Sequence, residues 1–333
     1  MTTERECIEH IGQLVTKQDN EFLLKGIGDD CAVIRKGDDM CLLLTTDTLV
    51  SGVHFDLSWH PPYLLGRKCI SVNMSDIAAM GGKPYACLLT IGFPNKVPPW
   101  LDDFMKGFLE VLQVYDTLLI GGDTVMSKND TVFSVTLLGE MDRTKVCYRS
   151  GAKAGDIIWV SGSLGNAAAG LELCRRGFYA GKDSAGKWQN LLRSHLDPEP
   201  HVELGDLLAA SGFVHAMMDI SDGLATDLAH LCHESGVGAE IEQALLPVDE
   251  ILREAAVDLD RPSMDWVIRG GEDYQLLFTT EAAVAQKLHK YIAERSGRQI
   301  FPVGRIVEGQ DVYLLNGSEK EEISFQGYEH FTK

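Results

Sequence analysis

The chain has 333 residues, of which 45% are hydrophobic and 24% charged, and its formal net charge at pH 7 is -19. This length favours two domains over one, and the ordinary globular composition excludes a disordered chain or a fibre. The excess of acidic residues argues against nucleic acid and against an anionic membrane surface as partners, because both attract surfaces rich in Lys and Arg.

The N-terminal segment is polar, and no apolar run is long enough to span a bilayer, so we expect a cytoplasmic protein that does not bind membranes. The eight cysteines form no C-x-x-C pair and lie mostly among apolar residues. We therefore expect reduced, buried thiols and neither a disulfide framework nor a zinc site.

Strands and helices mix throughout the first half of the chain. Hydrophobic patterns predict strands over 41–46, 86–92, 117–120 and 131–139, and helices over 64–80 and about 100–115. The strand over 41–46 is expected to end at Asp47, and the strand over 117–120 to end at Gly121-Gly122-Asp123.

On the helix over 64–80, Asp76 shares a face with the apolar residues Leu65 and Val72. An acidic side chain on a core-facing stripe is costly unless it is paired or metal-bound, so Asp76 is a candidate ligand.

A turn-rich segment over 149–156 predicts a domain boundary, with residues 1–148 as the N-terminal domain and residues 149–333 as the C-terminal domain. In the second domain, we expect strands over 157–161, 214–218, 238–242, 275–279 and 300–306, and helices over 164–176, 201–211, 223–234 and 282–294. Because strands and helices mix in both domains, the predicted fold class is α/β or α+β.

Carboxylates recur along the chain in settings rich in Gly, Ser and Thr. They lie in the motifs Gly-Ile-Gly-Asp-Asp (26–30), Thr-Thr-Asp-Thr (45–48), Met-Ser-Asp-Ile (74–77), Gly-Gly-Asp-Thr (121–124), Asp-Ile-Ser-Asp-Gly (219–223) and Gly-Gly-Glu-Asp-Tyr (270–274). If these carboxylates converge on one cleft, they raise one another's pKa values unless a cation lies between them. Ligation by oxygen alone points to magnesium, and magnesium with glycine-turn amides suits a polyphosphate.

Each motif alone also has a structural interpretation. Asp and Gly over 26–30 are usual turn residues, and Thr45 and Thr46 are ordinary strand residues that could equally supply hydroxyl or carbonyl oxygens to magnesium. The binding interpretation gains weight because an apolar strand followed by Asp beside Gly or Thr recurs at Asp47, Asp123 and Asp219.

The same choice applies to the second half of the chain. Ser221 or Asp222 could cap the helix that follows, although the N-terminus of a helix is also a site where Ser221 could hold a phosphate. Arg149 could pair with a nucleotide phosphate, or it could form a surface salt bridge.

Taken together, these motifs resemble the thiamine-monophosphate kinase family, a branch of the superfamily that includes aminoimidazole ribonucleotide synthetase and selenophosphate synthetase. The resemblance rests on stretches in family order, which are 26–33, 46–55, 72–81, 120–124, 149–156, 219–224, 270–274 and 327–331. The resemblance implies a mixed-sheet N-terminal domain that dimerises through its strands and a sandwich-like α/β C-terminal domain, and so a homodimer.

The resemblance also implies an activity, which is ATP-dependent phosphorylation of thiamine monophosphate, the final step of thiamine diphosphate biosynthesis. Carried over by position, it makes several residues magnesium ligands, namely Asp30, Thr45, Thr46, Asp47, Asp76, Asp123, Asp219 and Asp222. It places ATP, the phosphoryl donor, near Gly122, Asp123, Arg149 and Ser221. It places thiamine monophosphate near His54, Glu272 and Tyr328.

No general base is expected, because the acceptor is a phosphate monoester whose second pKa, near about 6, leaves it largely ionised at neutral pH. Direct in-line transfer then needs only positioning and charge neutralisation. Three alternatives stay open. They are another ATP-using enzyme of the superfamily, such as an aminoimidazole ribonucleotide synthetase, a magnesium-dependent phosphatase, and a non-catalytic nucleotide-binding or maturation protein.

Overall fold

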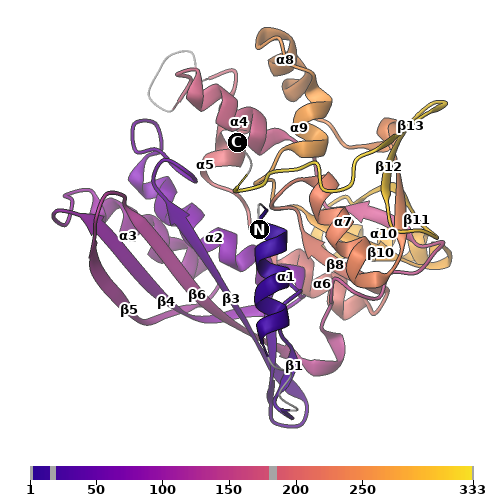
Figure 1. The fold of residues 1–333 in the computed structure, drawn as a ribbon, viewed down its shortest axis with the longest axis horizontal. Helices are drawn as coiled ribbons and strands as arrows, with labels where there is room; N and C mark the ends of the chain where they lie inside the picture. Colours follow the sequence, from indigo (N-terminus) through magenta and orange to yellow (C-terminus); the bar gives the residue numbers. More distant parts are fainter. Residues whose placement is uncertain (1–2, 16–19, 180–185, 332–333) are drawn as a thin grey trace.

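The protein folds into two mixed sheets with helices packed against them, as seen in a computed structural model that describes residues 3–15, 20–179 and 186–331 (Figure 1). Ten α-helices and thirteen strands lie in this described part of the chain. The mixture of strands and helices in both halves confirms the predicted fold class.

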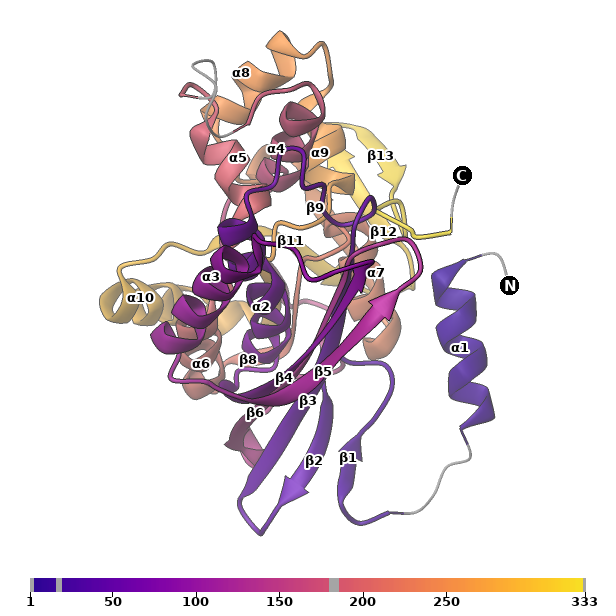
Figure 2. The same cartoon turned by 90° about the vertical axis from the view of Figure 1, so that its left-hand side faces the viewer.

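The first sheet has six strands in the order β1-β2-β3-β6-β4-β5. Its strands are β1 (Leu23–Lys25), β2 (Ala32–Lys36), β3 (Met40–Val50), β4 (Lys83–Pro94), β5 (Leu118–Ser127) and β6 (Val132–Asp142). Neighbouring strands are antiparallel except β4 and β5, which run parallel. Helices α2 (Pro62–Ala79) and α3 (Leu101–Val114) pack on one face of this sheet (Figure 2). Cys41, Leu43 and Thr45 of β3 are buried, as the two-residue period of a strand requires.

Helix α2 lies at the centre of the molecule. It contacts α3 and strands β3, β4 and β6 on one side, and α5, α6 and β8 of the second half on the other. As a result, Lys68, Ser71 and Ser75 are buried even though they lie off the apolar stripe. A helix enclosed in this way needs partners for every polar side chain that it carries.

The second sheet has seven strands in the order β13-β12-β9-β11-β7-β10-β8, and only β12 and β9 are parallel neighbours. Its strands are β7 (Ile157–Val160), β8 (Val214–Asp219), β9 (Gly238–Glu242), β10 (Leu276–Thr280), β11 (Phe301–Val307), β12 (Val312–Asn316) and β13 (Glu319–Glu322). The helices of this half are α4 (Asn166–Arg175), α5 (Gln189–Leu196), α6 (Val202–Ser211), α7 (Leu224–Ser235), α8 (Glu250–Asp258), α9 (Ser263–Arg269) and α10 (Ala285–Ser296).

Two hydrophobic cores meet the two faces of this second sheet. Trp159 and Phe278 stack with ring centroids 6.2 Å apart and belong to the core that continues under the first sheet. Ile158 and Leu277, their neighbours in sequence, point to the opposite face and join a core with α7. The first core therefore joins the two halves of the chain along α2.

The structure corrects several expected boundaries. Strand β5 does not end at Gly121-Gly122-Asp123 but continues to Ser127, and β3 continues past Asp47 to Val50. The helix expected over 282–294 begins as a 3-10 turn and becomes α-helical at Ala285. Several elements were not predicted, namely α1 (Glu4–Leu14), β1, β2, α5, α8, α9, β12 and β13.

All eight cysteines are free, and every one except the partly exposed Cys7 is buried, as expected from the sequence. Across the residues described, each helix is too short or too polar to traverse a lipid bilayer.

Candidate active site

A cavity of about 520 Å³ brings together residues from both halves of the chain. Carboxylates line part of its wall, among them Asp30, Asp47, Asp76, Asp219 and Asp222. The rest of the wall includes the aromatic residues His54, Trp59, Tyr274, Tyr328 and His330, with the cations Arg149 and Arg175. The acids and arginines of the wall can therefore bind an anion together with metal cations, and the aromatic residues can bind a flat organic group.

Three of the carboxylates form a compact cluster. Asp30, Asp76 and Asp219 each offer one oxygen, and these oxygens lie within 4.8 Å of one another. Asp30 precedes β2, Asp76 lies in the last turn of α2, and Asp219 ends β8. Tertiary packing thus gathers three acids that are far apart in sequence.

The cluster carries a charge that the protein alone does not balance. Burial and, after it, the nearby Asp30 raise the pKa of Asp219 to about 7. Burial, followed by Asp47 and Asp219, raises the pKa of Asp76 well above its ordinary value. Asp30 Oδ2 is buried without a hydrogen-bond partner among the described residues. Oxygen-only donors, mutual repulsion and an unpartnered oxygen all fit a bound magnesium ion.

Neighbouring side chains on α2 and β3 fix the cluster's orientation. The Thr45 hydroxyl donates to Asp76 Oδ2, and the Ser75 hydroxyl donates to Asp219 Oδ2 at 2.5 Å. The amide of Asp47 donates to Asn73 Oδ1 at 3.0 Å, and burial raises the pKa of Asp47 to about 6. Thr45 and Asp47 therefore lie on the side of β3 that faces α2, as strand alternation requires.

Thr46 points the other way. Its side chain is exposed, and its hydroxyl donates to the carbonyl oxygen of Val135 at 3.0 Å. The Thr46 hydroxyl therefore faces away from the cluster. Of the predicted magnesium-ligating oxygens of Thr46, this leaves its main-chain carbonyl oxygen.

Gly122 and Asp123 are not brought to the cavity by their own chain. They lie on β5, an exposed edge strand, and Asp123 Oδ1 accepts the amide of Thr124 at 2.8 Å. Strands β6 and β4 separate β5 from β3, which places Asp123 about 14 Å from β3 at ordinary strand spacing. Neither residue is among those that line the cavity.

The loop 219–223 places Ser221 and Asp222 on the cavity wall. The structure does not support the capping interpretation, since α7 has no side-chain cap at its N-terminus. Instead, Asp227 Oδ2 accepts the amides of Asp222 and Gly223, each at 3.0 Å. Burial and, after it, Glu4 raise the pKa of Asp222 to about 6. Both Ser221 and Asp222 are thus left free to meet a ligand.

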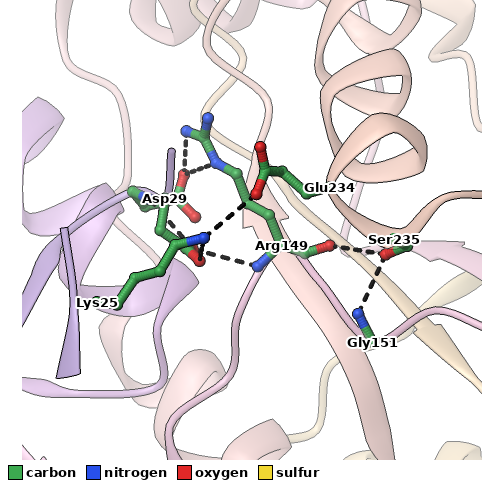
Figure 3. Close-up of polar contacts among 7 residues, drawn as sticks. Lys25, Asp29, Arg149, Gly151, Glu234 and Ser235 are labelled. Carbon is green, nitrogen blue, oxygen red and sulfur yellow. Dashed lines mark hydrogen bonds and ion pairs between the residues drawn. The ribbon is translucent and has the colours of Figure 1, made fainter. Parts of the chain in front are cut away.

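Arg149 lies between Asp29 of the first half of the chain and Ser235 at the end of α7 (Figure 3). Its Nη2 lies 2.8 Å from Asp30 Oδ1, and its amide donates to Asp29 Oδ1 at 3.1 Å. Ser235 donates to the Arg149 carbonyl oxygen at 3.1 Å. Only 22% of the Arg149 side chain is exposed. Arg149 therefore forms a salt bridge with a buried acid at the cavity wall, and its pairing with a nucleotide phosphate stays a prediction.

Aromatic side chains form a second cluster in the cavity. The His330 ring lies 5.2 Å from His54 and 5.1 Å from Tyr328, measured between centroids. His54 Nδ1 accepts the amide of Val50 at 3.0 Å, and the Tyr328 amide donates to the carbonyl oxygen of Asp222 at 2.8 Å. His54 and Tyr328, both predicted to bind thiamine monophosphate, thus lie together beside Asp222, a predicted magnesium ligand.

Glu272 lines the same cavity and is paired with two residues that sequence reasoning missed, Lys68 and His195. Asp273, its neighbour, has a structural role, because it accepts the amides of Gly165 at 2.6 Å and Ala167 at 3.1 Å at the start of α4. Lys68 and His195 belong to no motif, so only tertiary packing identifies them.

Comparisons with known proteins agree in one family. The model of the AIR synthase related protein N-terminal domain matches residues 28–141, and that of the C-terminal domain matches residues 153–315. A thiamine-monophosphate kinase of Buchnera aphidicola subsp. Acyrthosiphon pisum is 34% identical over 331 residues, 99% of each chain.

Solved structures show the same likeness. The structure described as AaThiL complexed with AMPPCP and TMP is 31% identical, with a TM-score of 0.81 over 96% of both chains. The thiamine-monophosphate kinase of Stenotrophomonas maltophilia K279a is 37% identical, with a TM-score of 0.76, and the match covers 93% of this chain and 94% of that one.

Proposed function

Because the chain belongs to the thiamine-monophosphate kinase family of AIR synthase related proteins, we infer that it transfers the terminal phosphoryl group of ATP to thiamine monophosphate. It is a phosphotransferase that makes thiamine diphosphate, with ATP as the phosphoryl donor. The observation that carries this function is a single cavity in which an acidic cluster and an aromatic cluster lie together.

The chemistry requires two anions to meet. The acceptor phosphate is ionised at neutral pH, since its second pKa is about 6, so the site needs no general base. It needs instead to align the two phosphates and to offset their repulsion. The cavity supplies groups for positioning, with carboxylates in one part of its wall and aromatic rings in another.

We propose that Asp30, Asp76 and Asp219 hold magnesium, with Asp47 and Asp222 beside them. Magnesium bound there would neutralise negative charge on the phosphoryl oxygens. The carboxylates cannot do this themselves, because they are negatively charged too. The mutual distance of 4.8 Å or less between their oxygens, the raised pKa values of Asp76 and Asp219, and the Oδ2 of Asp30, unpartnered among the residues described, support this role.

Other residues would then orient the two substrates. Arg149 and Ser221 line the cavity next to the acids, where a guanidinium and a hydroxyl can bind phosphates of ATP. His54 and Tyr328 offer flat rings to the acceptor, and a tyrosine face attracts a cation such as the thiazolium. The carboxylate of Glu272 can accept a hydrogen bond from the amino group on the pyrimidine of thiamine monophosphate.

A product assay tests this function. Purified protein incubated with thiamine monophosphate, ATP and magnesium is expected to yield thiamine diphosphate and ADP in equal amounts. A magnesium-dependent phosphatase would release inorganic phosphate instead. An enzyme of another branch would leave thiamine monophosphate unchanged, and either result would contradict the proposal.

We further propose a homodimer that forms through β5. This edge strand carries exposed apolar side chains, with Ile120 59% and Met126 79% exposed, and unpaired apolar edges are usually covered by a partner. The same strand carries Gly122 and Asp123, the two predicted ATP-site residues that do not reach the cavity of their own chain. A second copy can supply them.

Mixing two inactive variants tests whether Asp123 acts across the dimer. Chains with Asp123→Ala are co-expressed with chains carrying Asp76→Ala. In a mixed dimer, one site keeps its own Asp76 and receives Asp123 from the other chain, so random pairing restores about a quarter of wild-type activity. If the mixture stays inactive, or if the protein is monomeric by sedimentation, the proposal is wrong.

A further inference from the structure

Each oxygen of the Glu272 carboxylate lies close to a side-chain nitrogen of a buried residue. Lys68 Nζ lies 2.7 Å from Glu272 Oε1, and His195 Nδ1 lies 2.8 Å from Glu272 Oε2. Lys68 has no exposed side-chain surface and His195 has 1%, whereas Glu272 keeps 23%. Lys68 and His195 therefore contact the carboxylate on its buried side, and its exposed side faces the cavity.

The burial of Lys68 has a cost that stability alone does not explain. A lysine ammonium loses several kcal/mol of hydration when buried, and an ion pair seldom recovers more than this. Lys68 does not line the cavity, while His195 does, beside the ring of Trp59 at 5.5 Å. Lys68 reaches the cavity wall through its hydrogen bond to Glu272.

The backbone of Glu272 is fixed as well. Its φ of 69° lies in the left-handed region, and its amide donates to the carbonyl oxygen of Ser221 at 2.7 Å. Lys68 lies on α2 eight residues before Asp76, which is about 12 Å along a helix axis. One helix thus anchors the group that holds Glu272 and a member of the acidic cluster.

We propose that Lys68 and His195 are positioning residues that clamp Glu272 as an ionised, acceptor-only carboxylate, which selects acceptors carrying an amino group on their heteroaromatic ring. This inference rests on the proposed function, in which Glu272 meets the aminopyrimidine of thiamine monophosphate.

The selection follows from hydrogen-bond chemistry. An ionised carboxylate accepts hydrogen bonds but cannot donate them. With Oε1 accepting from Lys68 and Oε2 lying beside His195 Nδ1, the remaining lone pairs suit an amino group and repel a carbonyl oxygen in the same place. Burial by itself raises the pKa of Glu272, but Lys68 and His195 outweigh burial and hold that pKa below its ordinary value.

The experiment compares two acceptors, thiamine monophosphate and its analogue with a carbonyl oxygen in place of the pyrimidine amino group. Wild-type protein is expected to favour the amino acceptor in kcat/KM by about 1,000-fold or more, as sites built to receive a hydrogen bond do.

Lys68→Met keeps the length of the side chain and removes the charge. It is expected to raise KM for thiamine monophosphate about 10- to 100-fold and to reduce the preference between acceptors about tenfold, with KM for ATP unchanged.

Two further variants separate positioning from folding. His195→Asn retains a donor near the position of Nδ1 and is expected to keep most of the preference, whereas His195→Leu loses it. In a Glu272→Gln background, Lys68→Met should add little, because its effect passes through Glu272. Lys320→Met, which removes an exposed lysine paired with Glu240, is the matched control.

The outcomes are distinct. If Lys68→Met and His195→Leu lower kcat/KM equally for both acceptors, the clamp has only a structural role and the inference is wrong. The inference is also overturned if neither variant changes KM for thiamine monophosphate. If wild-type protein makes no thiamine diphosphate at all, the proposed function fails, which is a separate result.

Discussion

Asp76 lies where folding alone would favour an apolar side chain. Its neighbours on α2, Ser75 and Ile77, are buried, and burial together with Asp47 and Asp219 raises its pKa well above the ordinary value. A carboxylate in this position lowers the stability of the metal-free protein. Its presence is therefore explained by binding and not by packing.

Asp76→Asn is expected to separate these two effects. The amide has the same shape and can still accept from the Thr45 hydroxyl, but it carries no charge. We expect activity to fall at least about a hundredfold, as when several kcal/mol of charge stabilisation are lost, while the melting temperature of metal-free protein at pH 8 rises. Activity assays and thermal melts with EDTA measure both effects.

Glu319→Gln is the control, because Glu319 is an exposed carboxylate on β13. It should change neither quantity. An active Asp76→Asn protein would remove Asp76 from the site, and a lower melting temperature would show that the acid stabilises the fold.

Sequence motifs could predict the acids but not their supports. Asp30, Asp76 and Asp219 recur in similar local settings, and the structure brings them together. Lys68 and His195 have no such setting, since an isolated lysine or histidine on a helix gives no sign of burial. Whether such a residue is exposed depends on which element packs over it, and that is a property of tertiary structure.

At the scale of single elements, α2 and β5 show where local pattern succeeds and where it fails. The 3.6-residue period predicted α2 correctly, but its polar stripe is buried by α5, α6 and β8, which lie far along the chain. The paired glycines of β5 suggested a turn. In the structure they let the strand continue, because a side chain at Gly122 would meet β4.

Gly122→Ala is expected to disrupt β5. Gly122 has a φ of 156°, and an added Cβ would lie 1.8 Å from the carbonyl oxygen of Leu89. The two backbones must separate to relieve this overlap, which we expect to cost about 2–4 kcal/mol in the free energy of unfolding. Chemical denaturation measures that change.

Gly12→Ala on α1 is a matched control, because nothing lies within 4 Å of the added Cβ. A Gly122→Ala protein as stable as Gly12→Ala would show that β5 and β4 can separate without cost.

At the scale of the whole molecule, the cavity exists because the two halves pack on either side of α2. The sequence predicted two mixed halves, and each half could be assigned most of its strands and helices. How the halves meet could not be predicted, because it depends on side chains such as Trp159 and Phe278, which join a core shared with the first sheet. Unpredicted elements such as β13, with the sequence Glu-Lys-Glu-Glu, are exposed and carry no hydrophobic period.

The balance of charge across this assembled cavity should make the stabilising effect of magnesium depend on pH. Burial raises the pKa of Asp219 to about 7 and those of Asp47 and Asp222 to about 6. Since these folded-state values exceed the ordinary value of 3.8, the acids destabilise the metal-free fold increasingly as pH rises from about 4 to 7. Buried histidines such as His60 and His201, whose pKa values burial lowers, oppose this trend on the acidic side.

The difference between melts with and without magnesium isolates the acids, because the histidines contribute equally to both. At pH 5 protons occupy the carboxylates and compete with the metal, so we expect a small rise in melting temperature on adding magnesium. At pH 8 the carboxylates are ionised, and the rise should be several degrees larger, as expected for a ligand that binds only the folded state. Sodium chloride at matched ionic strength should not reproduce this rise, and Asp76→Asn should abolish most of it. An equal or larger rise at pH 5 would mean that the acids whose pKa values are raised are not the groups that bind the metal.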